Sequence, residues 1–544
     1  MKKNSFIEGT IVATLGILLV KVIGVIYVIP FNAIIGETGG ALYGYGYNIY
    51  QLFLSISSAG FPFAISKLTS EYNALGQKKA VKDTYQISLR LISIISLIIF
   101  LILFIFAPQI GKLIIGSSTE GNTYQDIAFV IRCVSFAILV VPFLSVTKGF
   151  LQGNKYITPY SISQVIEQVV RVIIILVGSF LCMKVFKFPL KYAVGISVSA
   201  AFFGGLVAYI YLRKKVRDAN LLPKDVEKDK NPISKKEIIR KIFMYSIPFI
   251  LISLINNLYT TVDMILLSRT MSDYLHLKSS IIESIVGVYT TWGIKLNNII
   301  LAISTGLVTS LIPNVVDAFT KKDMNDVNDK FNKAFQCVLL VIVPMTIFMS
   351  LLVKPIWTLF YGKSYYGPVV YKFFVYTALF GGVYTIFVNT LQGINKYRLV
   401  IATVLTGLIA NAILDVPLMI VFYNMGANVS YGAIAAALIG YTLSISISLI
   451  VLHKKYQFRF NKTIKRLPTY FLSWFIFIIT IILLKQFIPT NLENRLLQIP
   501  ILIIYGLISF AIYIYINDTS GNIKEVFGIN TSNIIKKIFK KKDS

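Results

Sequence analysis

Apolar segments long enough to cross a lipid bilayer follow one another along almost the whole chain. A membrane-spanning helix needs about 20 mostly apolar residues, and fourteen segments of the 544-residue sequence meet that requirement. Only 14% of the residues are charged, whereas about a quarter are charged in soluble chains. A soluble multidomain enzyme and a disordered chain are therefore excluded, and an all-α polytopic membrane protein is predicted. The expected spans are 9–35, 42–68, 86–107, 127–151, 159–183, 191–212, 242–268, 284–312, 334–353, 369–393, 398–422, 431–452, 468–488 and 497–516.

Basic residues mark one side of these spans. The chain holds 53 Lys and Arg against 24 Asp and Glu, and most basic residues fall in alternate connecting segments, as the positive-inside rule describes. With the N-terminus inside, the inner segments hold 35 basic residues and the outer loops about ten. We therefore expect a multi-pass protein with both termini in the cytoplasm and no nucleic-acid partner. The first apolar stretch lacks a small-residue cleavage site, so we expect it to remain as span one.

Three sequence markers recur in the halves of the chain at nearly one offset. Pro108, followed by Gly116, recurs 247 residues later as Pro355, followed by Gly362. Ser-Ala-Gly ending at Gly60 is followed 246 residues later by Ser-Thr-Gly ending at Gly306. Leu-Gln-Gly-Asn-Lys-Tyr from Leu151 is followed 240 residues later by Leu-Gln-Gly-Ile-Asn-Lys-Tyr from Leu391. Six spans separate the copies, so both run the same way across the membrane, as in two-lobed secondary transporters. The predicted parts are an N-lobe (1–212), a basic cytoplasmic linker (213–241), a parallel C-lobe (242–453), two extra helices (454–516) and a basic tail (517–544).

The first eighty residues hold a dense set of motifs: Gly9-Thr10 with Thr14-Leu15-Gly16, Tyr27-Val28-Ile29-Pro30-Phe31, Gly39-Gly40-Ala41-Leu42, Tyr45-Gly46-Tyr47-Asn48, and Gly60-Phe61-Pro62 with Ser66-Lys67. This set, on two six-helix lobes plus two extra helices, resembles the YtgP branch of the MurJ-type lipid-linked oligosaccharide flippases. These belong to the multidrug/oligosaccharidyl-lipid/polysaccharide exporter superfamily. The resemblance implies a flippase for lipid II, an undecaprenyl-pyrophosphate-linked peptidoglycan precursor, in a bacterial cytoplasmic membrane. It also implies an apolar groove for the lipid tail beside spans thirteen and fourteen.

Two lysines, Lys21 and Lys295, lie deep in predicted spans. Lys21 is about twelve residues into span one, roughly 18 Å along a helix. A charge at that depth costs on the order of 2.5–3.5 kcal/mol, so each lysine needs a buried carboxylate, a wet cavity or a function. In a two-lobed transporter these spans line the central cavity, where two ammonium groups suit a pyrophosphate.

The resemblance adds detail at the first of these lysines. The family has Arg-Val-Leu-Gly where this chain has Lys21-Val22-Ile23-Gly24, and its following Arg-Asp pair aligns with Tyr27-Val28. The substrate-binding candidates are Lys21, Lys295, Tyr27 and Arg269.

A second set of polar residues is acidic. Asn411 and Asp415 are four apart in span eleven, hence on one helix face, and Asp263 lies in span seven of the same predicted lobe. Carboxylate and amide oxygens without sulfur or imidazole suit a hard cation, and sodium-coupled MurJ members are similar in this respect. We expect a sodium site here and no organic cofactor; the alternatives are a hydrogen-bonded polar contact or a pairing of Asp263 with a lysine.

Other charged residues have simpler interpretations. Glu167 and Arg171 are four apart in span five, in the favourable order for a structural ion pair. Arg132, Lys148 and Arg269 lie near span ends, where long side chains reach toward the interface. No nucleotide-binding or hydrolase motif is present, so we expect no enzymatic activity and an energy source in ion gradients, membrane potential or the substrate gradient.

Several functions compete with lipid II flipping. A relative could export a teichoic-acid, capsular or spore-cortex precursor, and a multidrug antiporter of the same superfamily would need acidic rather than basic cavity residues. A polyprenyl-phosphate glycosyltransferase would need paired carboxylates on an outer loop, and the short outer loops carry none. A passive scaffold would not retain costly charges at mid-membrane. We expect a monomer that binds a lipid-linked oligosaccharide and membrane lipids.

Overall fold

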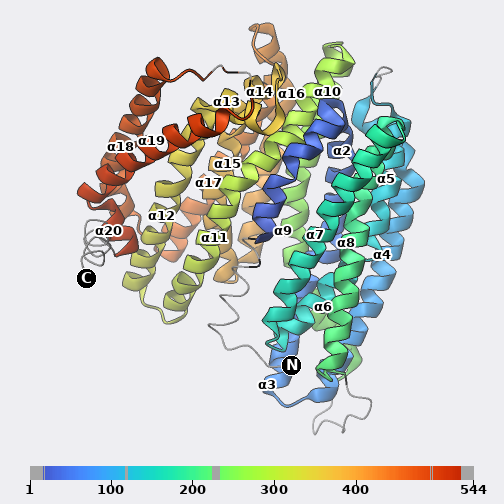
Figure 1. Ribbon diagram of the computed structural model, residues 1–544. Helices are drawn as coiled ribbons and strands as arrows, with labels where there is room; N and C mark the ends of the chain where they lie inside the picture. Colours follow the sequence, from blue (N-terminus) through green and yellow to red (C-terminus); the bar gives the residue numbers. More distant parts are fainter. Residues whose placement is uncertain are drawn as a thin grey trace, which may run out of the picture. The chain divides into compact units, whose positions relative to one another are not determined.

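The computed structural model is built of α-helices (Figure 1). It describes residues 16, 19–116, 121–222, 233–490, 492 and 494–528, and these contain no β-strand. Thirteen helical segments among them are long and apolar enough to cross a membrane, and they correspond one for one to predicted spans two to fourteen. Predicted span one, 9–35, lies partly outside the described residues; its described part is helical over 19–26 and again from Val28.

The helices pack into two compact units, Met1–Trp292 and Gly293–Ser544. Helix α9, which the sequence analysis assigned to the second lobe, packs against α2, α3 and α4 of the first unit. The first unit contains α2 (Val28–Ser58), α3 (Phe61–Ala74), α4 (Lys78–Ile115), α5 (Tyr124–Ile138), α6 (Val141–Gly153), α7 (Ile157–Phe180), α8 (Leu190–Asp218), α9 (Lys235–Arg269), α10 (Ser279–Gly287) and the π-helical turns η1 (Leu181–Val185), η2 (Thr270–Tyr274) and η3 (Val288–Trp292). The second contains α11 (Gly293–Thr320), α12 (Met324–Leu351), α13 (Val353–Tyr361), α14 (Tyr366–Phe374), α15 (Tyr376–Gly393), α16 (Tyr397–Asn424), α17 (Ser430–Tyr456), α18 (Asn461–Phe487), α19 (Gln498–Thr519) and α20 (Asn522–Phe527).

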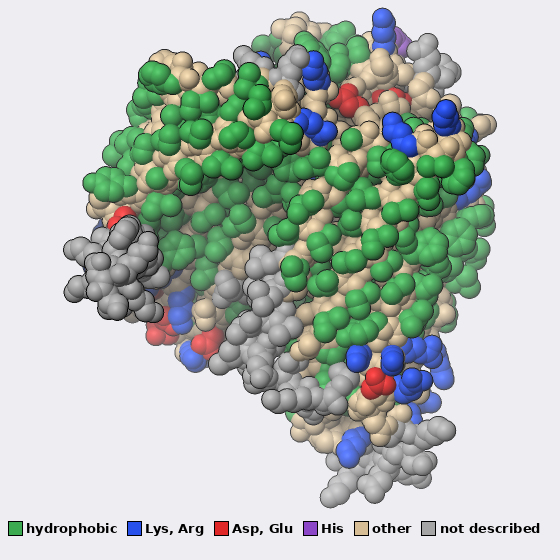
Figure 2. Space-filling model, in the orientation of Figure 1, with side chains coloured by type: hydrophobic (Ala, Val, Ile, Leu, Met, Phe, Trp, Pro, Cys, Tyr) green, Lys and Arg blue, Asp and Glu red, His purple; other side chains and the backbone are tan. Residues whose placement is uncertain are grey.

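The outer faces of the helices are apolar. On α4, exposed side chains recur every three or four residues, which places them on one helix face; they include Ile94, Leu97, Ile98, Leu101 and Ile105. Figure 2 shows hydrophobic side chains over the middle of the helices and Lys and Arg side chains near their ends. This pattern is that of a lipid-facing surface between two polar interfaces.

Small residues allow helices inside the first unit to approach closely. Gly149 and Gly153 are four apart on α6, and a Cβ atom there would lie 2.4 Å from the Pro62 carbonyl oxygen and 2.6 Å from the Ser66 carbonyl oxygen of α3. Membrane helices associate through such contacts because lipid gives apolar faces little reason to leave it. The hydroxyl of Ser70 then donates to the Gly153 carbonyl at 3.0 Å.

A single residue interrupts α2, which begins within predicted span one. Gly36 has φ 66° and ψ −165° inside α2, a backbone conformation that glycine adopts without steric cost. The chain therefore bends there, and the predicted end of span one at residue 35 agrees with this break.

The backbone repeats the internal duplication predicted from the sequence. After α6, Lys155 has φ 66° and after α15, Asn395 has φ 60°, at the predicted offset of 240. At both places the next residue donates its N–H to the carbonyl of the leucine five residues earlier, at 2.9 Å, which makes each turn a Schellman motif. Gly116 and Gly362 also share a positive φ, at the offset of 246. The two halves thus have the same kinds of turn at the C-terminal ends of equivalent helices.

Candidate functional site

The first helical segment runs along α7. A Cβ atom on Gly16 would lie 3.1 Å from the Ser161 Cβ, and one on Gly24 would lie 3.5 Å from the side-chain amide nitrogen of Gln168. Lys21 lies between these two contacts, and its side chain is exposed rather than packed in the helix core. Tyr27, one turn beyond Gly24, is buried at the turn before α2.

A three-charge cluster lies on the same stretch of α7. Glu167 accepts from Lys148 Nζ at 2.8 Å and from an Arg171 guanidinium nitrogen at 3.1 Å. All three side chains are largely buried, with exposed fractions of 14–21%. Lys148 comes from α6, so the expectation that it reaches toward the interface is wrong: a buried carboxylate holds it inside the unit.

Three tyrosines of α2 lie near Arg171 of this cluster. Tyr43 and Tyr47 stack with ring centroids 5.2 Å apart, and Tyr47 and Tyr50 lie at 5.5 Å. The Arg171 guanidinium is within electrostatic range of all three phenol groups. With Lys21, the region holds three cations and one carboxylate, so its charge suits an anion carrying two negative charges.

The remaining predicted residues of the first unit pair locally. Asp263 of α9 is buried and accepts a hydrogen bond from the Tyr289 hydroxyl at 2.8 Å. Arg269 donates its Nε–H to Asp273, one turn later, at 3.1 Å. The structure therefore places both in the first unit.

Lys295 lies in the first turn of α11 in the second unit and is half-buried. Two residues on, the buried Asn297 donates to the Phe374 carbonyl at 3.3 Å and to the Thr377 hydroxyl at 3.0 Å. These bonds fix α11 to the junction of α14 and α15, which holds the backbone at Lys295 in a defined position.

Asn411 and Asp415 are fully buried on α16. Helix α17 runs beside this face: the backbone of Met419 approaches Gly432, and Ser444 donates to the Thr403 carbonyl at 3.0 Å. The buried residues of α17 between these contacts carry no side-chain oxygen; they are Ala433, Ile434, Ala436, Ala437 and Gly440. Across the described residues, no group of three or more His, Cys, Asp or Glu could hold a metal ion. Asn411 and Asp415 thus supply two oxygen-bearing side chains on one buried face of α16.

Comparison with known proteins identifies the family. A family model described as "Polysaccharide biosynthesis protein" matches residues 6–319. The chain is 30% identical over 537 residues to the lipid II flippase MurJ of Bacillus subtilis (strain 168). The alignment covers 96% of this chain and 97% of that protein. The chain is a MurJ homologue of the polysaccharide biosynthesis family.

This MurJ homologue is also similar to other proteins in sequence and in fold. The stage V sporulation protein B of Bacillus subtilis (strain 168) is 27% identical over 213 residues, 39% of each chain. Among solved structures, the inward closed conformation of lipid II flippase MurJ covers 95% of this chain and 99% of its own, with a TM-score of 0.68 at 16% identity. An inward-facing multidrug resistance MATE family transporter covers 79% and 92%, with a TM-score of 0.59 at 13% identity. These two structures share the fold of this chain.

Proposed function

We propose that the chain flips lipid II, or a closely similar polyprenyl-pyrophosphate-linked saccharide, between the leaflets of a bacterial membrane by alternating access. The observation that carries this proposal is the end-to-end similarity to a lipid II flippase, over 96% of the chain. The proposed activity moves a lipid without making or breaking a covalent bond. The chain acts as a monomer, with both termini on the cytoplasmic side.

In this proposal, basic side chains of the first unit bind the pyrophosphate of the substrate. Lys21 lies on the helical segment beside α7 and Arg171 lies on α7 itself. Glu167 offsets one of the three positive charges of Lys21, Lys148 and Arg171. Guanidinium and ammonium donors form their strongest hydrogen bonds with phosphate oxygens. The pyrophosphate therefore binds here, within the first unit. Lys295, in the second unit, stays a separate prediction for a substrate contact.

A sodium ion is the proposed coupling ion. Asn411 and Asp415 offer oxygen ligands on one buried helix face, and hard cations prefer such ligands. Asp263, whose carboxylate accepts from Tyr289 in the first unit, stays a separate prediction as a cation ligand. Sodium bound at Asn411 and Asp415 would supply a positive charge that offsets the buried carboxylate.

The apolar tail lies beside α18 and α19 in this proposal. A polyprenyl chain of about 55 carbons avoids a polar cavity because each buried CH₂ favours an apolar setting by about 0.8 kcal/mol. Within the second unit, an apolar cavity of about 490 Å³ lies between α12, α19 and α20, and α18 exposes Phe471, Leu472 and Phe475. A photoactivatable polyprenyl chain should label α18 and α19 more than α4 to α8; equal labelling would contradict the tail assignment.

Complementation tests the main proposal. Expression of the chain should restore growth to a strain depleted of its lipid II flippase, and purified protein in proteoliposomes should move lipid II. A Lys21→Ala chain, matched for membrane level, serves as the inactive control. If the chain moves a teichoic-acid or capsular precursor but not lipid II, the glycan is assigned wrongly while the flippase mechanism stands. Export of cationic drugs alone would contradict both.

A further inference from the structure

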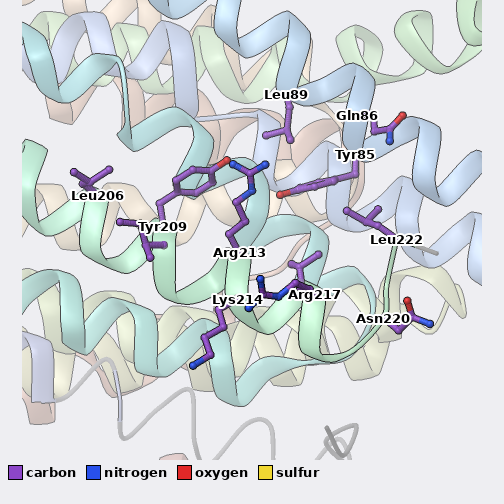
Figure 3. Close-up of a pocket in the computed structure, with 12 residues that line it drawn as sticks. Tyr85, Gln86, Leu89, Leu206, Tyr209, Arg213, Lys214, Arg217, Asn220 and Leu222 are labelled. Carbon is purple, nitrogen blue, oxygen red and sulfur yellow. The ribbon is translucent and has the colours of Figure 1, made fainter. Parts of the chain in front are cut away.

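A basic pocket opens at the end of α8, a helix that packs against α7. It has a volume of about 1000 Å³ and is lined by α4, by α8 and by the residues that follow α8. Figure 3 shows the lining side chains. Leu206, Ile210, Arg213 and Arg217 line it from α8, at the spacing of a single helix face.

The pocket is graded from apolar to basic. Leu206 and Ile210 of α8 and Leu89 of α4 line the end nearer the middle of the helices, whereas Arg213, Lys214 and Arg217 line the mouth. From residue 206 to residue 217 a helix rises roughly 16 Å. That length matches a lipid headgroup together with the first part of its acyl chains. A site for a soluble anion would have no need of the apolar part.

The charges at the mouth favour an anion. Among the described residues, Arg213, Lys214 and Arg217 form no ion pair with a carboxylate. The end of α8 carries roughly half a negative charge from its backbone dipole, and Asp218 adds one more. Four basic residues, 213–215 and 217, outweigh both.

One wall of the pocket is rigid. The Tyr85 ring stacks on Phe150 with centroids 4.4 Å apart, and the Tyr85 and Thr147 hydroxyls are 3.0 Å apart. Figure 3 shows the Arg213 guanidinium near the hydroxyl ends of Tyr85 and Tyr209. A guanidinium beside two phenol groups offers planar donors that suit phosphate oxygens.

We propose that this pocket binds the headgroup of an anionic glycerophospholipid, with Arg213 and Arg217 on the phosphodiester and the acyl chains along Leu206 and Ile210. Basic pockets between membrane helices on the cytoplasmic side recognise lipid phosphates in this way. None of the residues proposed to bind lipid II lines this pocket, and the site needs only that the chain spans a membrane. It makes the N-terminal unit responsive to the lipid composition of the inner leaflet.

Native mass spectrometry of the purified full chain tests the site with dioleoyl phosphatidylglycerol as the probe. The double variant Arg213→Gln with Arg217→Gln should retain about tenfold less of this lipid, since charge-assisted hydrogen bonds are lost. A matched variant, Lys454→Gln with Lys455→Gln at the exposed end of α17, removes the same charge on the same proposed membrane side and should bind as the parent does. Equal losses in both variants, or no loss in either, would overturn the proposal.

Two further probes separate a lipid from other phosphates. Glycerol 1-phosphate should not compete with phosphatidylglycerol for binding. Ile210→Trp, which places a larger side chain at the apolar end of the pocket, should weaken the binding of phosphatidylglycerol. Competition by glycerol 1-phosphate would mean a soluble-phosphate site, and binding of undecaprenyl pyrophosphate in place of phosphatidylglycerol would mean a second substrate site; both refute the proposal. If the double variant does not fold, a photoactivatable phosphatidylglycerol on the parent chain still decides, because labelling must fall on α4 and the end of α8.

Discussion

Glu167 is the carboxylate of the buried cluster that it forms with Lys148 and Arg171. It is the only carboxylate bonded to Lys148 and Arg171 among the described ion pairs, and all three side chains are largely buried. Removing one member of a buried pair leaves an uncompensated charge, whereas replacing a whole pair can be nearly neutral. The cluster therefore has two separable roles: it stabilises the packing of α6 on α7, and it leaves one cation in excess.

Glu167→Gln should destabilise the chain by about 3 kcal/mol, because two buried cations lose their carboxylate. The measurement is the free energy of unfolding in mixed micelles. Adding Lys148→Met should recover part of the loss. Asp329→Asn, at a more exposed pair with Lys333 and Lys462, is the matched control and should cost less than about 1 kcal/mol. Equal costs for Glu167→Gln and Asp329→Asn would contradict this account.

Lys21→Ala should abolish complementation of a flippase-depleted strain, while Lys21→Arg keeps most of it, because a cation of either shape can meet a pyrophosphate. Lys78→Ala removes a lysine that is exposed at the start of α4 and should have no effect. Growth of Lys21→Ala cells at the parental rate, with equal protein levels, would remove Lys21 from the substrate site.

Asp415→Asn should weaken the sodium dependence of transport in proteoliposomes, since ligand charge sets affinity for hard cations. The chain should still fold, because the amide keeps the shape of the carboxylate. A parent protein whose transport is the same in sodium and in potassium would eliminate the proposed ion site.

Among the elements, the paired turns after α6 and α15 differ in one informative residue. A left-handed backbone costs an ordinary residue about 1–2 kcal/mol, which glycine and, in part, asparagine avoid. Lys155→Gly should therefore raise stability by about 1 kcal/mol, and Asn395→Gly by less. Thermal unfolding of the two variants in detergent measures both. A larger gain at Asn395 than at Lys155 would show that something other than backbone conformation governs these turns.

Helix periodicity explains which parts of this fold the sequence could predict. Long apolar runs predicted spans two to fourteen, and the repeated Leu-Gln-Gly segments predicted matching turns. The role of Lys148 was missed because spacing along one helix reveals i,i+4 pairs such as Glu167 and Arg171, but says nothing of a partner on another helix. The packing of α9 against α2, α3 and α4 also could not be predicted, since it depends on helix–helix contacts rather than on hydropathy.

For the whole molecule, sidedness is the property to measure. In a chain whose three cysteines are replaced, Lys187→Cys and Lys363→Cys should react with an impermeant maleimide in intact cells. Lys155→Cys and Lys454→Cys should react only after permeabilisation, because the positive-inside rule places them in the cytoplasm. All four positions are exposed, so access to solvent does not limit the comparison. The reverse pattern would contradict the proposed placement of both termini on the cytoplasmic side.

The break at Gly36 also bears on how the chain enters the membrane during synthesis. The described helix continues on both sides of that one residue, so the first two apolar segments leave the ribosome with almost no polar chain between them. The insertion machinery must then accept them as a single helical hairpin. The orientation that Lys2 and Lys3 favour for the first segment therefore fixes the opposite orientation for the second. A polar loop inserted at Gly36 would uncouple these two insertion events in the newborn chain.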